Sequence, residues 1–447
     1  MTADSILIKN GYVFTMDEQD TVHSPGWVLT RGDKIAAVGA GQPPAEVAAQ
    51  AGRVIDAAWM AVLPGLVNGH THLGQTFMRG LGDDKTLIAW LKTVMWPLQM
   101  AMTPEDMRLA SLLGLVENLR CGAAAVVQHH KITNTPAHVD AAAEAAQTVG
   151  VRLRLARSWV DMGDAAESPA AIEADLLRLH EQWHGAAEGR ITVSSGPMVP
   201  WRCSDETMRR TVALARQRGL STHIHVAESA DEIEMMRRRN GLRHIEWLDS
   251  LGLLGPDLQL VHCVQVDDRE IALIAASGAT VVYCPVSNMY LASGAAPVDK
   301  MLGRGIPVAL GTDGSGSHNS QDILETLKTG VLLAKVSSGQ ATALLPHDAL
   351  RMVTTAGARL LGGDYRGQLI PGAAADITVV NLNTARSMPV HHPASALVYN
   401  ATGPDVHTVM VDGRILLDAG VVTMLDESAL LAEARQAAAA LLRRIGE

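Results

Sequence analysis

The stretch A-V-L-P-G-L-V-N-G-H-T-H, residues 61–72, begins as an apolar run and ends in two histidines around one threonine. A short apolar run bounded by a turn signal is typical of a strand that is buried on both faces. Residues two apart on a strand point to the same face, so the imidazoles of His70 and His72 can face one point. The stretch therefore predicts the first strand of an α/β core, residues 61–70, with two candidate metal ligands at its end.

Seven more strand-like segments follow, and helix-length stretches such as 105–120 and 205–218 separate them. The segments span residues 122–130, 151–158, 190–197, 221–228, 258–264, 279–285 and 307–313. Eight strands with helical crossovers over roughly 250 residues predict a (β/α)8 TIM-like barrel. The alternative is a doubly wound open sheet, but no G-x-G-x-x-G follows the first strand.

The two ends of the chain carry a different pattern. In residues 1–60, segments of alternating apolar and polar residues are separated by Asn-Gly and Gly-Asp, as in an antiparallel sheet. The same pattern returns at 375–382 and 406–420. We therefore expect an α/β protein of three parts. Residues 1–60 form the N-terminal part of a small β-sandwich domain, 61–364 form the barrel, and 365–447 form the C-terminal part of the β-sandwich and a terminal helix.

Composition and charge exclude several classes of partner. The 447 residues carry a net charge of −10 and a calculated pI of about 5.9, so no basic field exists for nucleic acid or an anionic membrane. No apolar run of about 18 residues and no signal peptide are visible. The four cysteines form no C-x-x-C pair, which argues against a disulfide framework. We expect a cytoplasmic protein with a small-molecule partner, and the sequence leaves open whether it is a homo-oligomer.

In a barrel of this kind the active site lies at the carboxyl ends of the strands. The fifth strand carries His223, His225 and Glu228 there, the sixth carries His262, and the eighth ends at Asp313 within G-T-D-G. His223 points the same way as His225 but lies one layer deeper, so we interpret it as barrel core or as a neighbour of the ligands. Histidines and a carboxylate that converge at one mouth suit zinc or ferrous iron.

Each of these residues also has an ordinary structural interpretation. A single histidine among 17 is more often a surface residue or a satisfied core residue than a metal ligand. Four separate strand ends that all carry ligand-type residues, however, favour one site over chance placement. At the end of the second strand, either His129 or His130 must face the barrel interior, where it can contact a substrate. Cys263 and Cys284 are interpreted as small buried hydrophobes.

At these positions the chain resembles the amidohydrolase superfamily over nearly its whole length. The resemblance rests on L-P-G-L-V-N-G-H-T-H-L-G-Q (63–75) in the first strand and on H-V-A-E (225–228), V-H-C (261–263) and G-T-D-G (311–314) in later strands. G-Q-L-I-P-G-A-A-A-D-I-T-V-V (367–380) is similar to the family's return into its β-sandwich. The chain is most similar to the aminohydrolase branch, which includes deaminases of nucleosides, guanine, 8-oxoguanine and pterins as well as triazine hydrolases.

The resemblance implies four ligands to one divalent metal ion, zinc or alternatively iron: His70, His72, His225 and Asp313. It also implies Glu228 as the proton shuttle and His262 as the group that orients the attacking water, with Asp313 and His262 helping to return protons to the leaving nitrogen. Binuclear relatives carry a bridging lysine or glutamate on the fourth strand. The fourth strand here, R-I-T-V-S-S-G-P (190–197), has neither, which favours a mononuclear site.

The resemblance also bears on the substrate. Nucleoside-deaminating relatives usually carry W-P-x-E after the first strand, where the acid binds ribose hydroxyls, but this chain has W-P-L-Q with Gln99 at that position. The end of the second strand, V-V-Q-H-H-K (126–131), is more similar to relatives that process bases, pterins and triazines. The resemblance therefore implies a hydrolytic deaminase that releases ammonia from a free base such as an aminopurine, a pterin or an s-triazine.

Three alternatives stay open. The first is a deaminase of adenosine, methylthioadenosine or S-adenosylhomocysteine, and the second is a hydrolase of a cyclic amide or of a chloro- or alkylamino-triazine. The third is a barrel that has lost its chemistry, which would lack a ligand, and none of the expected ligands is missing. The resemblance implies substrate contacts at Gln75 and Arg157, whose amide and guanidinium groups can hydrogen-bond to a heterocycle. With Gln99 at the W-P-x-E position and His129 at the end of the second strand, they make up the expected substrate-binding residues: Gln75, Gln99, His129 and Arg157.

Overall fold

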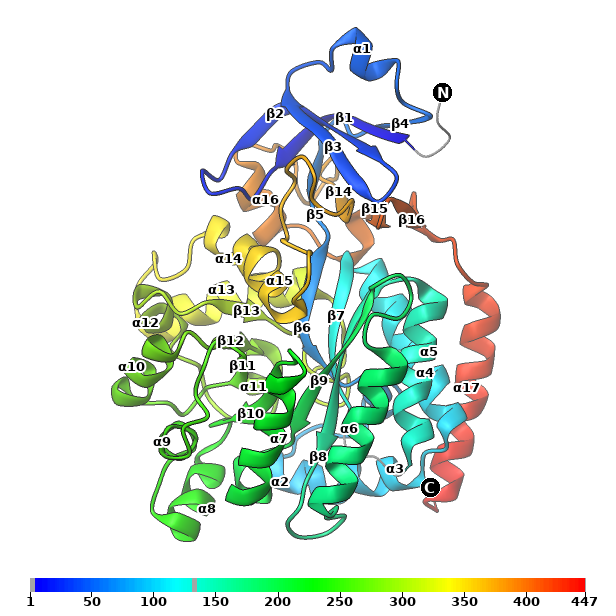
Figure 1. Ribbon diagram of the computed structural model, residues 1–447. Coiled ribbons are helices and arrows are strands. Elements are labelled where there is room, and N and C mark those ends of the chain that lie inside the picture. Colours follow the sequence, from blue (N-terminus) through cyan, green and yellow to red (C-terminus); the bar gives the residue numbers. More distant parts are fainter. Residues whose placement is uncertain (1–4, 131–134, 447) are drawn as a thin grey trace.

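An eight-stranded parallel sheet forms the centre of the protein in the computed structural model, which describes residues 5–130 and 135–446 (Figure 1). Its strands follow one another in chain order: β6 (Leu66–Thr71), β7 (Ala123–His129), β8 (Arg152–Trp159), β9 (Ile191–Pro197), β10 (Thr222–Val226), β11 (Leu258–His262), β12 (Thr280–Tyr283) and β13 (Val308–Leu310). The N–H of Asp313, just after β13, donates to the carbonyl of His70 in β6 at 2.9 Å. The last strand thus returns to the first, and the predicted (β/α)8 barrel is confirmed.

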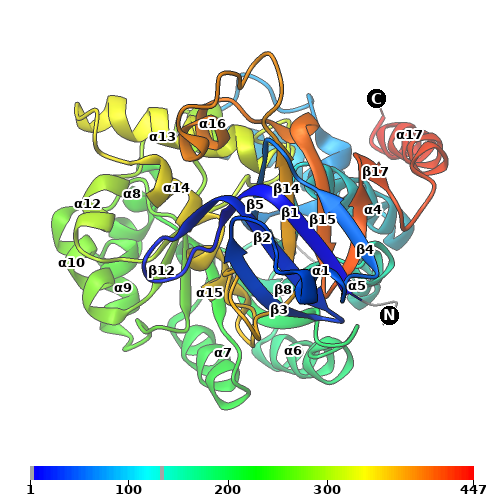
Figure 2. The same ribbon diagram turned by 90° about the horizontal axis from the view of Figure 1, so that it is seen from above.

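The strands of the two termini form a second, mixed sheet at the amino-terminal end of the barrel (Figures 1 and 2). Its order is β17-β16-β15-β14-β5-β1-β2-β3, and β4 pairs with β1. The strands are β1 (Ser5–Phe14), β2 (Val22–Arg31), β3 (Lys34–Ala40), β4 (Arg53–Asp56), β5 (Met60–Pro64), β14 (Ile377–Asn381), β15 (Val406–Val411), β16 (Arg414–Asp418) and β17 (Val421–Val422). A small β-domain built from both ends of the chain is therefore confirmed, as one continuous sheet.

The first predicted strand, residues 61–70, is in fact two strands. Met60–Pro64 pairs antiparallel with β14 in the terminal sheet, whereas Leu66–Thr71 pairs with β7 in the barrel. The chain crosses from one sheet to the other at Gly65, where an added Cβ would lie 2.5 Å from the Cβ of Ala124. Apolar composition does not reveal this break, because both strands are buried.

Helices surround the barrel in a ring (Figure 2). The carboxyl ends of the strands point away from the terminal sheet, toward α2 and α3 (Figure 1). The α-helices are α1 (Ala45–Ala48), α2 (Leu87–Trp90), α3 (Trp96–Ala101), α4 (Pro104–Arg120), α5 (Pro136–Val149), α6 (Pro169–Trp183), α7 (Asp205–Gln217), α8 (Ala230–Asn240), α9 (His244–Ser250), α10 (Asp268–Ser277), α11 (Pro285–Tyr290), α12 (Val298–Gly303), α13 (Ile323–Ser338), α14 (Pro346–Met352), α15 (Thr355–Leu361), α16 (Pro393–Tyr399) and α17 (Glu427–Arg444). Short 3-10 segments span Leu73–Met78, Pro200–Arg202 and Gly403–Asp405, and a π-helical segment, Leu91–Met95, joins α2 to α3. Within 5–130 and 135–446, no helix has the length and apolar character needed to cross a membrane.

The alternation of the barrel strands divides their apolar side chains between two layers. Ile224 of β10 and Leu260 of β11 belong to the large cluster between the strands and the surrounding helices. Val261 of β11 and Ala309 of β13 instead pack inside the barrel with Leu360 of α15. Helix α15 therefore fills the barrel interior at the end that faces the terminal sheet, and the opposite end is left for polar side chains.

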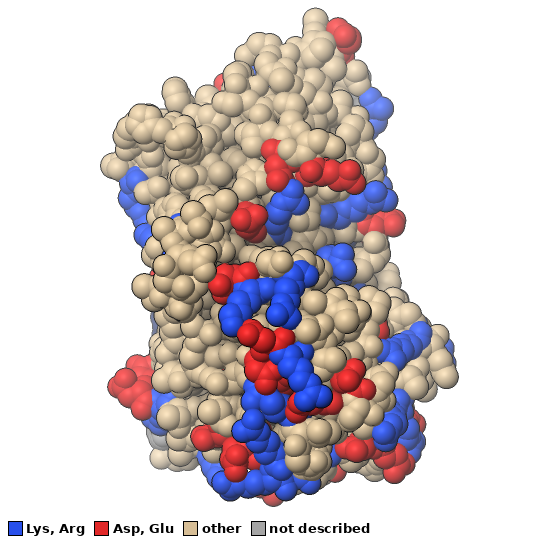
Figure 3. All heavy atoms as spheres, turned by 90° about the vertical axis from the view of Figure 1, so that its left-hand side faces the viewer, with Lys and Arg blue, Asp and Glu red and all other residues tan. Residues whose placement is uncertain are grey.

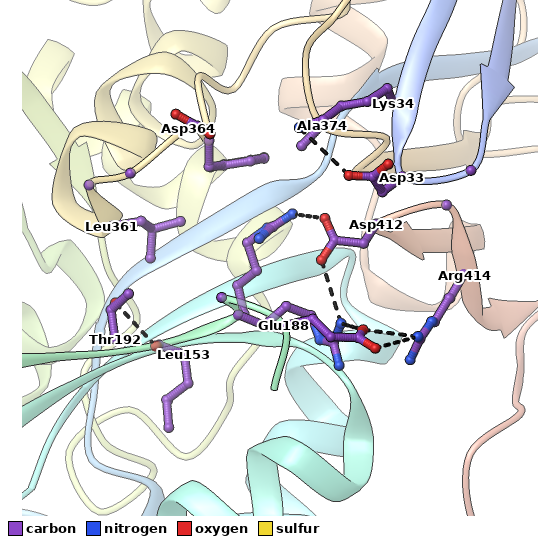
Figure 4. A pocket seen from close by; sticks show the side chains of 18 of the residues that line it. Asp33, Lys34, Leu153, Glu188, Thr192, Leu361, Asp364, Ala374, Asp412 and Arg414 are labelled. Carbon is purple, nitrogen blue, oxygen red and sulfur yellow. Dashed lines mark hydrogen bonds and ion pairs between the residues drawn. The ribbon is translucent and has the colours of Figure 1, made fainter. Parts of the chain in front are cut away.

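Ion pairs join the terminal sheet to the barrel beside a cavity of about 930 Å³ (Figure 4). Arg152 of β8 donates from Nε to Asp376 at 2.5 Å and also contacts Asp412. At the rim, Arg414 lies 2.9 Å from Glu188. Asp376 is buried, so loss of its arginine would leave an uncompensated charge, which costs about 3–5 kcal/mol in such pairs. This cavity lies at the amino-terminal end of the barrel strands, and its charges of both signs hold the two sheets together.

Acidic and basic side chains lie side by side on the face of the molecule shown in Figure 3. Neither the acidic nor the basic side chains form a continuous patch on this face. In the whole sequence, 47 Asp and Glu residues outnumber 37 Lys and Arg residues. This face offers no basic surface of the kind that binds nucleic acid.

Candidate metal centre and active site

Imidazoles and a carboxylate from three barrel strands meet at the carboxyl end of the barrel. His70 and His72 come from the end of β6, His225 comes from β10, and Asp313 follows β13. The Nε2 atoms of His72 and His225 are 3.3 Å apart, and Asp313 Oδ1 lies 3.3 Å from His72 Nε2. Asp313 Oδ1 also lies 3.5 Å from His70 Nε2, and all four side chains are buried. The structure thus brings the four expected ligands together at one point.

Hydrogen bonds to backbone carbonyls fix which nitrogen carries the proton in two of these rings. Nδ1 of His72 lies 2.6 Å from the carbonyl oxygen of His129, and Nδ1 of His225 lies 2.8 Å from that of Met198. A carbonyl oxygen only accepts, so both Nδ1 atoms carry hydrogen and, in neutral rings, both Nε2 atoms present lone pairs. Burial, and then the neighbouring imidazoles, lower the pKa of His225 well below its usual value, so its ring is neutral.

The surroundings of His70 complete the same pattern. Its Nδ1 lies 2.8 Å from His223 Nε2, and its buried Nε2 has no hydrogen-bond partner among the residues the structure describes. Ligand atoms of His70, His72 and His225 all lie within 4.8 Å of one another. Lone pairs and a carboxylate oxygen that face one another this closely repel unless a cation lies between them. The donor set, three imidazole nitrogens and one carboxylate, therefore fits a divalent metal ion such as zinc or iron.

The carboxylate of Asp313 is held in place by three donors. The Gly314 N–H donates to Oδ1 at 2.7 Å, and the hydroxyls of Ser287 and Ser317 donate to Oδ2 at 2.6 and 3.1 Å. Burial opposes ionisation, but the neighbouring His70 and the other imidazoles hold the pKa of Asp313 well below its usual range. The side chain is therefore a carboxylate that can bind a cation. The sequence argument did not single out the two serines.

Glu228 and His262 form a second pair beside these donors. His262 Nε2 lies 3.5 Å from Glu228 Oε2, and Asn288 donates from Nδ2 to His262 Nδ1 at 3.0 Å. Because Nδ1 accepts, Nε2 of a neutral His262 carries the proton, unlike the Nε2 atoms of the three other histidines. His262 is therefore a hydrogen-bond donor toward the site. Asn288 and Ser287 lie in C-P-V-S-N (284–288), directly after β12, and a survey of polar residues at every strand end would have found both.

Left-handed backbone turns direct these two side chains into the site. In β10, Ile224 and Val226 face the helices, so strict alternation would send Glu228 the same way. The preceding residue, Ala227, has a φ of 51°, a left-handed conformation that breaks the alternation of the strand before Glu228. By the alternation of β11, His262 would face the helices, as Leu260 does. His262 itself has a φ of 73°, and this left-handed conformation turns its side chain toward the site. Such φ values cost non-glycine residues about 1–3 kcal/mol and concentrate at functional sites.

His244 supports the turn that carries Glu228. The N–H of Ala227 donates to His244 Nδ1 at 2.8 Å, and His244 Nε2 lies 3.2 Å from the carbonyl oxygen of Glu232. The ring is fully buried, and this burial lowers the pKa of His244 to about 4. Nδ1 must stay unprotonated to accept from Ala227, so this neutral ring is part of the structure of the turn.

Stability is expected to fall as the pH drops from 6.5 toward 4, because the unfolded state then binds a proton at His244 that the folded state does not. Between about pH 7.5 and pH 5 this one group should remove about 2 kcal/mol from the free energy of unfolding. Urea unfolding of the wild type and of His244→Asn, which keeps an acceptor near Nδ1, measures the difference. The variant should lose about 2 kcal/mol less than the wild type over this range, and an equal loss would contradict the assignment. His391→Asn, at an exposed position, serves as the control.

Three of the four expected substrate contacts lie near this cluster or on elements beside it. The ring of His129 lies 4.6 Å from that of His225 between centroids, so His129 rather than His130 faces the barrel interior. Gln75 is fully buried beside Gly314, whose lack of a side chain leaves room for the amide. Gln99 is buried in α3.

Arg157 does not join the site. It shares a face of β8 with Leu153 and Leu155, which pack toward the helices rather than into the barrel. Its guanidinium donates to Glu167 at 2.8 Å and to Asp175 at 2.8 Å. The guanidinium of Arg157 is thus hydrogen-bonded to two carboxylates on the helix side of the sheet. This geometry does not support the contact between Arg157 and the substrate that the sequence led us to expect. Counting the strand alternation from the two leucines would have given this direction.

A narrow cavity of about 40 Å³ leads to His225 and Glu228. Its walls are mainly apolar and aromatic, with contributions from Leu87, Leu91, Trp96, Met198 and Trp201. Apolar walls with a few polar groups at one end are typical of small-molecule sites in general. The cavity therefore connects the outside of the barrel mouth to the polar cluster.

The fold and the site define a metal-dependent hydrolase built on a parallel barrel. Residues 61–416 match the model of the amidohydrolase family. The chain therefore belongs to the amidohydrolase family, and it is a hydrolase that acts on carbon–nitrogen bonds other than peptide bonds.

Named relatives match almost the whole chain. The 5′-deoxyadenosine deaminase of Methanosarcina mazei is 38% identical over 98% of this chain and 99% of its own length. The 5-methylthioadenosine/S-adenosylhomocysteine deaminase of Pelotomaculum thermopropionicum is 36% identical with the same coverage. Among solved structures, an adenosine deaminase from Xanthomonas campestris with bound zinc has a TM-score of 0.91 and 32% identity, over 98% of both chains. An atrazine chlorohydrolase from Arthrobacter aurescens in complex with zinc has a TM-score of 0.90 and 26% identity, over 97% of this chain and 100% of the other.

Proposed function

We propose that the protein is a zinc-dependent deaminase of adenine nucleosides that uses a single metal ion. The names of the relatives, deaminases of 5′-deoxyadenosine and of methylthioadenosine and S-adenosylhomocysteine, support a nucleoside substrate. The names of these relatives favour a nucleoside substrate over the free base that W-P-L-Q and the histidines at the end of the second strand had led us to expect. The observation that carries the proposal is the proton-bearing His262 beside Glu228, at the edge of the three-histidine, one-aspartate cluster.

Four side chains would hold the metal: His70, His72, His225 and Asp313. A zinc ion held there would supply Lewis acidity, which lowers the pKa of water and favours attack on the carbon that bears the amino group. Glu228 accepts a proton from the attacking water at a carboxylate oxygen and delivers it to the adjacent ring nitrogen. His262 donates from Nε2 to the attacking oxygen and so fixes its approach. Asp313 and His262 help to pass the second proton of the water, from the hydroxyl now on that carbon, to the amino group; the C–N bond breaks, ammonia leaves and a carbonyl forms.

Gln75 is our first candidate for reading the heterocycle. Its side chain is fully buried, and neither Oε1 nor Nε2 has a hydrogen-bond partner in the part of the chain that the structure describes. Leaving both groups of a buried amide unsatisfied costs about 1–3 kcal/mol each, which a substrate with a donor and an acceptor on one edge would offset. We propose His129, whose ring lies beside those of His72 and His225, as a second contact and Gln99 as a third.

The substrate class is tested by ammonia release from a panel of adenosine, 5′-deoxyadenosine, methylthioadenosine, S-adenosylhomocysteine, adenine, guanine, a pterin and an aminotriazine. We expect at least one nucleoside to be deaminated with a kcat/KM at least tenfold above that of adenine, since the binding energy of the sugar adds to that of the base. Protein with Glu228→Gln, purified in parallel, controls for contaminating deaminases. A kcat/KM that is higher for a free base, pterin or triazine would restore the original prediction and refute this one.

A further inference from the structure

The ring of His70 is one end of a hydrogen-bonded chain that crosses the barrel interior. His70 Nδ1 lies 2.8 Å from His223 Nε2, and His223 Nδ1 lies 2.8 Å from Gln259 Oε1. Gln259 then donates from Nε2 to the carbonyl oxygen of Leu360 in α15 at 2.9 Å. All four residues are buried. The chain thus runs from the candidate metal centre at the barrel mouth to the helix that fills the opposite end.

The carbonyl of Leu360 sets the direction of every bond in this chain. A carbonyl oxygen only accepts, so the amide nitrogen of Gln259 must face Leu360 and its oxygen must face His223. The hydroxyl of Ser221, 3.3 Å from the same amide nitrogen, gives the second N–H a partner and agrees with this orientation. His223 therefore carries its hydrogen on Nδ1 and accepts at Nε2, so His70 donates from Nδ1 and keeps a lone pair on Nε2, facing Asp313.

We infer that Gln259 is a positioning residue for the metal site, acting through His223 on the tautomer and orientation of His70. Without the acceptor Oε1, His223 is able to carry its hydrogen on Nε2 instead. That hydrogen would point at Nδ1 of His70, which would then have to hold its own proton on Nε2, where a protonated nitrogen cannot bind a metal. The inference rests on the metal site of the proposed function and is independent of the substrate.

Two substitutions of Gln259 separate positioning from packing. Gln259→Met keeps the volume and removes the acceptor, and we expect the dissociation constant for zinc, measured by competition with a chromophoric chelator, to rise about 10- to 100-fold. Gln259→Glu keeps an oxygen acceptor toward His223, and its zinc dissociation constant should stay within about threefold of the wild-type value. The absorption spectrum of the cobalt-loaded protein should change in the methionine variant and stay close to the wild type in the glutamate variant. Gln265→Met, a partly buried glutamine outside this chain, is the matched control.

The inference is overturned if the folded methionine variant binds zinc within twofold of the wild type with an unchanged cobalt spectrum. It is also overturned if the glutamate variant loses as much zinc affinity as the methionine variant, because a purely structural residue would behave in that way. If Gln259→Met does not fold, His223→Gln is used in its place. The amide oxygen of this glutamine can accept from His70 Nδ1, so we expect a zinc affinity close to that of the wild type. A 10-fold loss of zinc affinity would refute the proposed series of hydrogen bonds. A wild-type protein that binds no zinc would instead refute the metal site itself, whatever its substrate.

Discussion

Replacing Glu228 with glutamine is expected to lower kcat by about 10²- to 10⁴-fold while the protein keeps its zinc. Glutamine has the size of glutamate, but its amide cannot accept a proton from water and pass it on. Glu228 faces Nε2 of His262 at 3.5 Å and is not one of the four proposed ligands, so the metal should stay bound. Ammonia release gives kcat and KM, and elemental analysis gives the zinc content of the same sample.

A surface glutamate provides the control for this variant. Glu234 in α8 is half exposed and pairs with Arg238, so Glu234→Gln removes a carboxylate of the same type without touching the barrel mouth. Its kcat should lie within twofold of the wild-type value. A kcat of Glu228→Gln within about tenfold of the wild-type value would remove Glu228 from the mechanism. If the variant loses bound zinc in proportion to its loss of kcat, Glu228 is a metal ligand instead.

The second large effect is expected for His70→Ala, which should lose the bound metal and all measurable deaminase activity. Alanine removes the buried Nε2 that faces Asp313, so one of the four proposed donors is lost and its place is left empty. Zinc per protein should fall from about one equivalent to well below a tenth after dialysis against a weak chelator. Circular dichroism checks that the barrel still folds.

The exposed His391 is the matched control for this substitution. His391→Ala removes an exposed imidazole just before α16, outside the proposed ligand set, and should keep both the zinc content and the rate. If His70→Ala retains a full equivalent of zinc and turns over normally, the metal centre lies elsewhere. If it retains zinc but not activity, His70 acts on the substrate rather than on the metal.

Much of the fold follows from the sequence because strand and helix signals are local. Eight apolar segments separated by helix-length stretches predict the parallel barrel, and alternating segments at both ends predict the terminal sheet. The crossing from one sheet to the other at Gly65 does not follow from apolar composition, because both strands are buried, although Pro64-Gly65 within the run is a turn signal. The pairing of Met60–Pro64 with β14 and of Leu66–Thr71 with β7 shows where the chain leaves the terminal sheet.

The sequence by itself determined which side chains lie at the carboxyl ends of the strands, among them His70, His72 and Asp313. Spacing by two residues along a strand predicts that His70 and His72 share a face. The irregular pairing of β6 with β7 between Asn68 and Thr71, which only the structure shows, decides that this face is the site. The direction of Glu228 and His262 was decided only by the tertiary structure, since both follow the alternation that faces the helices and are turned inward by left-handed residues. Contacts between distant segments hold those conformations against their local cost, and no pattern within one strand records such contacts.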